Sequence, residues 1–486
     1  MGDYMFKYCK KISVILMTLI LTLTSFYSAG RMVLAEETDE TTEATETTVP
    51  DDGIVTPEER KTDLLNEVHE DAPSISAASY VLYDADSGSI LLGKDYDVQK
   101  EPASMTKVMT VLLALETLEM TDTITISHEM YEAAEAITSD YITLGVIEGE
   151  EFTVKDLVYA AVLESANDAS LVLGMYMGGT EAEFCEIMNK KAVEIGCENT
   201  HFSSAFGYST PDNVTTPYDM ALILNEAVSN TGYTEIAKTL NYRIEATNKY
   251  SSSRDISNGN KFVNTPQYAY EYYIGGKTGF TNTAGYTLCA ASRKNDRTLI
   301  GCVFNAADRD IRYADLIKLF DYGYSTFTTV EIKESEFSPL VEETRIQMND
   351  LLSDTNLYIS NQNIILEPYI TTTSSRAQLG STNKIDLSDA LIDTAAEHQV
   401  LEIPLYKVYS DKSYLIGTLV VEIDKKAGVV EINPEKKTNL TNVRNVLITF
   451  AVLSGLILLL VIVLLIFRAR IIKRRKDEVT KRPNML

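Results

Sequence analysis

Apolar residues are unevenly spread along the 486-residue chain, and two apolar runs lie outside any expected globular core. Near the start, the run from Ile12 to Leu23 follows three lysines and precedes small residues, which predicts a signal peptide over residues 1–35 or, as the alternative, an uncleaved anchor. Near the end, the uncharged stretch 446–467 is long enough to cross a membrane as a helix. A buried core helix is the alternative there. The basic tail at 468–486 predicts that the rest of the chain lies outside the cell.

Between these ends the pattern predicts a spacer and two folded regions. Residues 36–71 are rich in Glu, Asp and Thr and cannot bury enough apolar surface to fold, so a disordered spacer is expected. Residues 72–330 place strand patterns at both ends of a helical middle, which favours an α+β domain whose terminal strands share one sheet. Residues 331–435 predict a small all-β domain. The expected strands are 79–83, 89–92, 285–293, 298–306, 363–371, 401–408 and 413–423, and the expected helices are 105–118, 154–163, 169–177, 182–195 and 312–324.

A candidate nucleophile opens the helix expected at 105–118. Ser104 and Lys107 are three residues apart, so they share one helix face and the lysine amine can reach the serine hydroxyl. The helix N-terminus also offers unpaired N–H groups and partial positive charge, which favour an alkoxide. The same Ser-x-x-Lys spacing recurs at Ser381 and Lys384, but there it lies in a polar stretch that predicts a surface loop.

Two later motifs fit the same chemistry. Ser165 and Asn167 lie at a corner between two helical runs, where they can relay protons and hold a substrate amide. Lys277 and Thr278 lie on a predicted strand edge that can bind a carboxylate, and Gly279 lets the backbone approach an acyl group closely. In this order, the three motifs are typical of acyl-transferring serine enzymes that use lysine as the base.

A lysine can act as a base only when it is uncharged. The ordinary lysine pKa is about 10.4, and burial beside a second cation disfavours the charged form. We therefore expect burial and the nearby Lys277 to lower the pKa of Lys107, so that a neutral amine can take the Ser104 proton.

Composition narrows the partners and cofactors. The formal net charge of −27 excludes a nucleic-acid binder, because phosphates and the acidic body repel each other. No cysteine or histidine stands at metal-ligand spacing, so neither a metal nor another cofactor is expected.

Two cysteines lie on neighbouring strands of an expected hairpin. A two-residue turn at Asn295 and Asp296 would place Cys289 directly opposite Cys302. This arrangement permits a cross-strand disulfide, and the alternative is a pair of small buried core residues.

Over about residues 72–330, the chain resembles the serine D-alanyl-D-alanine carboxypeptidases, the low-molecular-mass penicillin-binding proteins of the peptidase S11 family. The resemblance rests on the three motifs in their extended forms and on further matches around them. These stretches read Tyr83-Asp84-Ala85-Asp86-Ser87-Gly88, Pro102-Ala103-Ser104-Met105-Thr106-Lys107, Ser165-Ala166-Asn167-Asp168-Ala169, Thr215-Thr216-Pro217-Tyr218-Asp219-Met220, Gly276-Lys277-Thr278-Gly279-Phe280-Thr281 and Ala284-Gly285-Tyr286.

The resemblance implies a penicillin-binding-protein or β-lactamase-like fold, a helical cluster on an antiparallel sheet. It implies removal of the terminal D-alanine from peptidoglycan stem peptides through an acyl-enzyme on Ser104, which β-lactams trap. It also implies an oxyanion hole made by the backbone N–H groups of Ser104 and Phe280. One departure concerns Ser204-Ala205-Phe206-Gly207, where family members usually show Asn-Pro-x-Gly, and it leaves the loop shape open.

Three other functions stay open at this stage. A serine β-lactamase would need a carboxylate that activates water, and Glu186 has a suggestive context but lies in the helix expected at 182–195. A transpeptidase of the same fold would transfer the acyl group to an amine instead of water. A non-catalytic wall-binding module would not need the Ser104 and Lys107 pair.

Overall fold

The computed structural model describes residues 53–66, 70–367, 369–388, 390–410 and 412–426. The predicted signal peptide, the membrane-spanning segment at 446–467 and the basic tail lie outside these residues, as does most of the predicted spacer. Within the described residues, no helix combines the length and the apolar character that crossing a membrane requires.

The N-terminal end of the described chain is folded further upstream than the sequence predicts. Helix α2 (Pro57–Asp63) begins at a capping box, in which the Thr56 hydroxyl accepts the Glu59 N–H and the Glu59 carboxylate accepts the Thr56 N–H. Leu64, which follows in a short 3₁₀ turn, is buried. The expectation of a disordered spacer through residue 71 is therefore wrong for this helix. Average composition does not reveal a capping box or a single buried residue such as Leu64.

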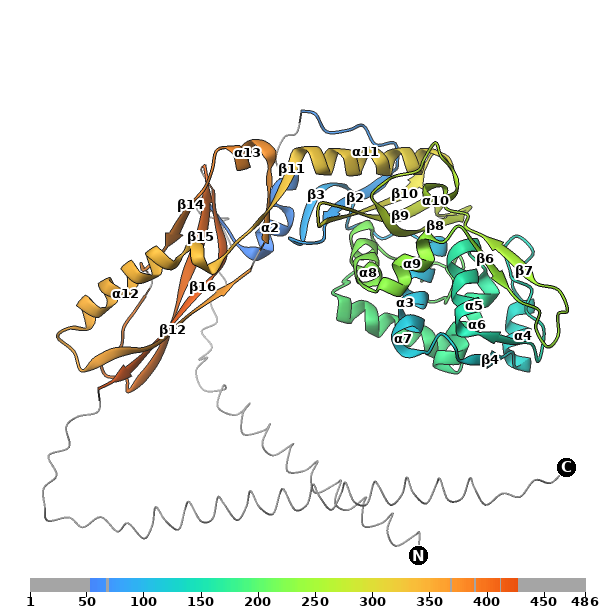
Figure 1. The fold of residues 1–486 in the computed structure, drawn as a ribbon, viewed down its shortest axis with the longest axis horizontal. Coiled ribbons are helices and arrows are strands. Elements are labelled where there is room, and N and C mark those ends of the chain that lie inside the picture. Colours follow the sequence, from blue (N-terminus) through green and yellow to red (C-terminus); the bar gives the residue numbers. More distant parts are fainter. Residues whose placement is uncertain (1–52, 67–69, 368, 389, 411, 427–486) are drawn as a thin grey trace, which may run out of the picture. The chain divides into compact units, whose positions relative to one another are not determined.

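Five antiparallel strands form the central sheet, in the order β3-β2-β10-β9-β8 (Figure 1). They are β2 (Ser79–Asp84), β3 (Ser89–Lys94), β8 (Tyr273–Thr281), β9 (Gly285–Lys294) and β10 (Arg297–Ala306). Strand β2 pairs with β10 although more than two hundred residues separate them along the chain. The predicted sharing of one sheet by the terminal strands is confirmed.

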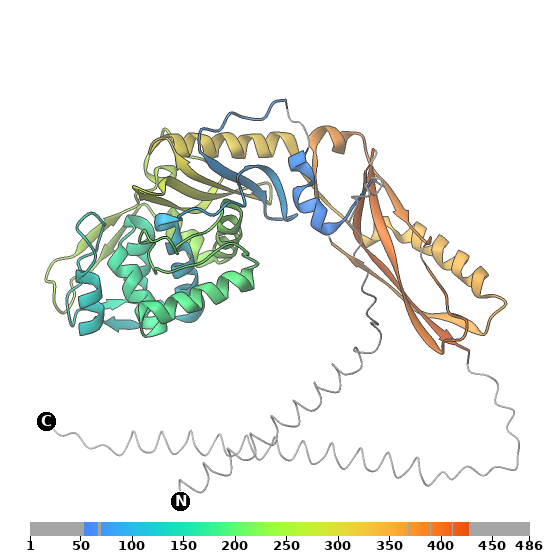
Figure 2. The same cartoon turned by 180° about the vertical axis from the view of Figure 1, so that it is seen from behind.

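The sheet is covered on both faces. Alternate residues of β9 point to opposite sides, so Leu288 and Ala290 pack in the core beneath helix α11 (Ile311–Thr326), whereas Cys289 packs in the core with the other helices. The gold helix α11 and the green helical cluster lie on opposite sides of the sheet in both views (Figures 1 and 2). Gly301 allows the close approach of α11, since a Cβ there would lie 2.5 Å from Leu316 Cδ2.

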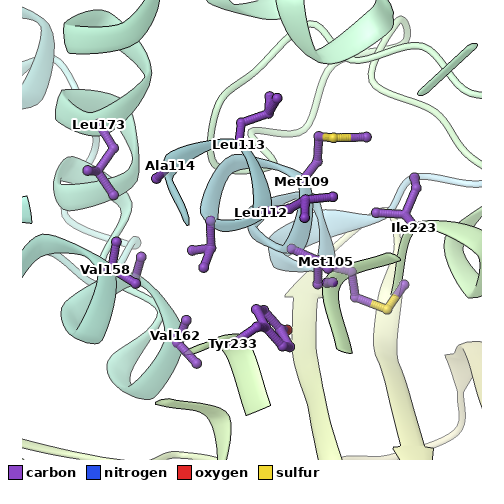
Figure 3. Close-up of a cluster of buried hydrophobic side chains, with 14 of the residues drawn as sticks. Met105, Met109, Leu112, Leu113, Ala114, Val158, Val162, Leu173, Ile223 and Tyr233 are labelled. Carbon is purple, nitrogen blue, oxygen red and sulfur yellow. The ribbon is translucent and has the colours of Figure 1, made fainter. Parts of the chain in front are cut away.

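Helix α3 (Lys107–Thr117) lies at the centre of the helical cluster. All eight residues from Lys107 to Ala114 are buried, which is expected of a helix that is packed on every side. Figure 3 shows side chains of neighbouring elements around this helix, among them Val158, Val162, Leu173, Ile223 and Tyr233. The other elements of the cluster are α4 (His128–Glu135), α5 (Val154–Tyr159) continued by a π-helical turn at Ala160–Glu164, α6 (Asn167–Gly178), α7 (Glu181–Ile195), α8 (Pro217–Ser229), α9 (Thr231–Lys238) and the two-stranded sheets β4–β5 (Thr123–Thr125, Glu151–Thr153) and β6–β7 (Asn241–Ile244, Arg254–Ser257). The short helix α10 (Lys261–Asn264) packs its Phe262 in the core on the α11 side of the sheet.

The cysteine hairpin has the predicted register. Cys289 lies opposite Cys302, and both turn residues, Asn295 and Asp296, have positive φ, as a two-residue hairpin turn requires. All four cysteines within the described residues are free thiols, and this pair is fully buried. The structure therefore matches the alternative of two buried core residues.

The region after residue 331 is mainly β structure, as predicted, but it also contains a 15-residue helix, α12 (Ser338–Leu352). Thr344, Met348 and Leu352 are its buried residues and recur every four positions, so the apolar stripe is narrow and easily missed. The strands and the remaining short helix are β12 (Leu357–Leu366), β13 (Tyr369–Thr373), α13 (Ser374–Gln378), β14 (Thr382–Ile385), β15 (His398–Tyr409) and β16 (Lys412–Lys425). Strand β11 (Phe327–Glu331), just before this region, pairs with β13.

Candidate active site

Ser104 lies in a tight 3₁₀ turn (Ala103–Thr106) that leads directly into α3. Ala103 before it has φ of 49°, a left-handed conformation that is uncommon outside glycine. Met105 after it is fully buried and anchors the turn in the core. The predicted placement of Ser104 at the head of a buried helix is confirmed, with the first turn wound more tightly than an α-helix.

The side chain of Lys107 is enclosed by three oxygen atoms. Its Nζ lies 3.0 Å from Ser104 Oγ and donates to Asn167 Oδ1 at 2.7 Å and to the Phe206 carbonyl at 2.7 Å. The side chain has no exposed surface. Burial, followed by the positive charge of Lys277, holds the pKa of Lys107 well below its usual range.

These contacts match a neutral amine. Carbonyl oxygens only accept, so Asn167 Oδ1 and the Phe206 carbonyl take the two N–H groups that an uncharged amine has. The Asn167 amide is oriented by its Nδ2, which donates to the Ile142 carbonyl at 2.8 Å. The lone pair of Lys107 is then left for the third neighbour, the hydroxyl of Ser104.

Ser165 and Lys277 form a second pair. Ser165 caps the end of the π-helical turn in the left-handed conformation, with φ of 65°, and its hydroxyl accepts from Lys277 Nζ at 2.9 Å. Lys277 also donates to the Thr278 carbonyl at 3.0 Å. The side chain is 3% exposed, and burial lowers the pKa of Lys277 to about 7.

Strand β8 approaches the Ser104 turn closely because of Gly279. A Cβ at this position would lie 2.3 Å from Thr287 Oγ1 and 3.0 Å from the Pro102 carbonyl. The buried Arg312 of α11 fixes the same strand end, donating to the Gly279 and Thr287 carbonyls at 2.9 Å each. Sequence reasoning missed Arg312, since nothing in the pattern of α11 distinguishes it from a surface arginine.

A cleft of about 390 Å³ unites the predicted residues. Six of the eight predicted site residues line it, and the other two, Lys107 and Lys277, lie behind it, each within hydrogen-bond distance of a lining serine. The lining residues outside the predicted set come from the loop between α4 and β5, from β9 and from around the start of α11. The full lining is Ser104, Asp140, Tyr141, Ile142, Ser165, Asn167, Thr278, Gly279, Phe280, Tyr286, Arg309 and Arg312.

The loop that departs from the family pattern is held by its own serine. The Ser204 hydroxyl accepts the backbone N–H groups of Phe206, Gly207 and Tyr208 at 3.3, 3.2 and 3.1 Å. Gly207 has φ of 88°, and a Cβ there would lie 1.9 Å from the Ala103 carbonyl. The loop thereby brings the Phe206 carbonyl to Lys107.

Two other sequence features lie elsewhere. Glu186 is exposed on α7 and does not line the cleft, so it offers no water-activating carboxylate there. Lys384 of the second Ser-x-x-Lys copy is half exposed and donates to Asp386 at 2.8 Å. The expectation of a loop at that copy is wrong in part, because residues from Thr382 onward form strand β14. No group of side chains in the described chain has the make-up of a metal site.

Comparison with known proteins gives consistent results. The peptidase S11 family model, described as D-alanyl-D-alanine carboxypeptidase, matches residues 66–308. DacF of Bacillus subtilis, a D-alanyl-D-alanine carboxypeptidase, is 33% identical over 254 residues, which cover 52% of this chain and 63% of DacF. A D-alanyl-D-alanine carboxypeptidase of Streptomyces sp. strain K15 is 30% identical over 267 residues, 52% of this chain and 89% of that protein.

The match to DacF thus spans less than two thirds of that relative's length. Among solved structures, the D-alanyl-D-alanine carboxypeptidase DacD of Francisella tularensis has a TM-score of 0.57 at 19% identity, covering 74% of this chain and 96% of that one, and this likeness concerns the fold. The family match extends over half of the chain and contains all three motifs, and the chain belongs to the D-alanyl-D-alanine carboxypeptidase family, peptidase S11.

Proposed function

We propose that the protein is a serine D-alanyl-D-alanine carboxypeptidase that removes the terminal D-alanine of peptidoglycan stem peptides. The observation that carries this proposal is the distance of 3.0 Å between Ser104 Oγ and a fully buried Lys107 Nζ whose other partners only accept hydrogen bonds. Family membership supplies the substrate class.

The first half of the reaction forms an ester. Neutral Lys107 takes the Ser104 proton as the oxygen attacks the carbonyl carbon of the penultimate D-alanine. The C–N bond to the terminal residue breaks, and its nitrogen leaves as an amine after receiving a proton. The hydroxyl of Ser165, which is hydrogen-bonded to Lys277, is the relay we propose for that proton. Water then hydrolyses the ester and restores Ser104.

Binding of the substrate is assigned to the edge of β8. The terminal carboxylate is proposed to bind near Lys277 and Thr278, where one buried cation and one hydroxyl are available. The N–H groups of Ser104 and Phe280 are proposed as the oxyanion hole, since Gly279 brings the end of β8 close to the Ser104 turn. β-Lactams would acylate the same serine.

Location follows from the sequence. The signal peptide over 1–35 and the membrane-spanning helix over 446–467 are proposed to place the catalytic domain outside a bacterial cell membrane, where its substrate is. The region from 331 to 435 would then act as a spacer between the membrane and the catalytic domain.

Release of D-alanine tests this function. The full chain is incubated with a diacylated peptide ending in D-Ala-D-Ala, beside Ser104→Ala and the control Ser381→Ala, which alters the second Ser-x-x-Lys copy. Wild type and Ser381→Ala should release D-alanine, and Ser104→Ala should not. Equal release by Ser104→Ala would overturn the proposal. Transfer of the acyl group to an added amine in preference to water would indicate a transpeptidase, and sustained penicillin turnover would indicate a β-lactamase.

A further inference from the structure

The carboxylate of Asp168 holds a wall of the cleft. This residue follows Asn167 in the first turn of α6, is 1% exposed, and lies outside the cleft lining. Both of its oxygens accept backbone N–H groups. Oδ1 accepts from Leu144 and Ala169 at 2.8 Å each, and Oδ2 accepts from Gly145 at 2.8 Å and Val146 at 3.2 Å.

The segment that Asp168 holds leads to the reacting groups. Tyr141 and Ile142, just before it, line the cleft, and Ile142 is 57% exposed there. The Ile142 carbonyl accepts both the backbone N–H of Asn167 at 2.9 Å and its Nδ2 at 2.8 Å. Because that second bond orients the Asn167 amide, its Oδ1 faces Lys107 at 2.7 Å.

We propose that Asp168 is a positioning residue for acylation, which fixes the 140–146 segment against α6 so that the Ile142 carbonyl aims the Asn167 amide at Lys107. The inference rests on the proposed function, since it concerns the same serine and lysine. Asp168 itself touches neither Ser104 nor the cleft, so it acts through Ile142 and Asn167.

The charge of Asp168 gives the role a second signature. Two charged groups act on the Lys107 amine, Lys277 from β8 and Asp168 from α6, and the carboxylate opposes the effect of burial by raising the lysine pKa. Asp168→Asn removes that charge, so the Lys107 pKa falls further. Acylation slows at low pH because Lys107 becomes protonated there, and in Asp168→Asn this acid limb of the pH profile therefore moves to lower pH. Asp168→Glu keeps the charge but displaces the oxygens.

Single-turnover acylation of the full chain by a chromogenic penicillin, measured across pH, tests this role. The rate constant is independent of how much of the sample is folded, so a partly unfolded variant still reports. Asp315→Asn is the matched control, because Asp315 is fully buried on α11, accepts the Ser76 and Ala77 N–H groups at 2.9 Å each, and does not line the cleft.

Asp168→Asn should slow acylation by about 10- to 100-fold and move the acid limb to lower pH. Asp168→Glu should slow it with the acid limb in place, and Asp315→Asn should lower only the melting temperature. An unchanged rate constant and acid limb in both Asp168 variants, with only stability lost, would overturn the inference while the proposed function stands. If wild type itself is not acylated, the proposed function falls and the inference with it.

Discussion

Lys107 and Lys277 are both buried, but their partners suit different roles. Lys107 lies among two acceptor-only oxygens and the Ser104 hydroxyl, so its uncharged form is fully satisfied. Lys277 donates to the Ser165 hydroxyl and the Thr278 carbonyl, and its pKa of about 7 leaves part of it charged near neutrality. One lysine is therefore suited to take a proton, and the other to hold an anion.

Replacing Lys107 by methionine tests the base. Lys107→Met keeps the volume of the buried side chain but removes the amine, so acylation by penicillin should slow by about 10²- to 10⁴-fold. Lys191→Met is the control, because it removes a lysine on the surface of α7 that pairs with Glu116. Acylation of Lys107→Met at the wild-type rate, measured by stopped flow, would rule out this lysine as the base.

The two lysines predict a bell-shaped pH profile of kcat/KM. Activity rises with pH as Lys107 loses its proton, which occurs below the usual lysine range because its pKa is lowered. Activity falls again as pH rises through about 7, because Lys277 there loses the charge that binds the carboxylate. Lys277→Arg keeps its charge to high pH, so the alkaline limb should move upward. An alkaline limb that stays in place in Lys277→Arg would show that another group sets it.

The site residues differ in how far the sequence reveals them. All eight predicted residues converge on the cleft. They could be predicted because each belongs to a short motif whose local element the pattern indicates. Arg312 donates to carbonyls 25 or more residues away, and the Ile142 carbonyl accepts from Asn167, 25 residues further along the chain. Contacts at such separations leave no local periodicity. The loop shape at Ser204 could not be predicted from the sequence. The three backbone hydrogen bonds that the Ser204 hydroxyl accepts depend on the folded path of the loop, which only the structure gives.

At the scale of elements, predictions succeeded where turn chemistry or a wide apolar face determines the structure. The hairpin register at Cys289 and Cys302 follows from a two-residue turn, and helix α3 follows from an apolar run without Gly or Pro. Helices α2, α8 and α12 were not among the predicted helices. The capping box of α2 and the narrow stripe of α12 are weaker signals than composition and neighbouring strand patterns, whereas the apolar face of α8 was overlooked.

The Ser204 loop offers a test at this scale. Ser204→Ala leaves three backbone N–H groups without their acceptor, which should cost about 1–3 kcal/mol of stability. Acylation should also slow by about tenfold, because the loop no longer fixes the Phe206 carbonyl at Lys107.

Thr180→Ala is the comparison for Ser204→Ala, since it removes a hydroxyl that caps α7 by accepting the Glu183 N–H at 3.1 Å. This control should lose stability without any slowing of acylation. Identical acylation rate constants for both variants would argue against the loop's part in orienting Lys107.

At the scale of the whole molecule, the central sheet explains why distant motifs meet. The sheet joins strands from the beginning and end of the catalytic region, and the helical cluster between them in sequence packs on one face. The Ser104 turn, the end of the π-helical turn and the edge of β8 therefore converge on one cleft. The sequence predicted the shared sheet, but the pairing of β2 with β10 required the structure.

The proposed membrane attachment can be tested by truncation. A chain ending at Glu435 lacks the segment 446–467 and should move from the membrane fraction to the soluble exported fraction while still binding penicillin. Fractionation of cells that express each form, with a labelled penicillin as the probe, gives the answer. A truncated chain that stays in the membrane fraction would place the anchor elsewhere.

The central claim is that Ser104 carries the acyl group and Lys107 activates it. Peptide mapping by mass spectrometry after a short exposure of the full chain to penicillin tests this most directly. The account predicts one penicilloyl adduct, located on Ser104, absent from Ser104→Ala and strongly delayed in Lys107→Met. An adduct on another residue, or the same adduct yield in Ser104→Ala, would contradict it.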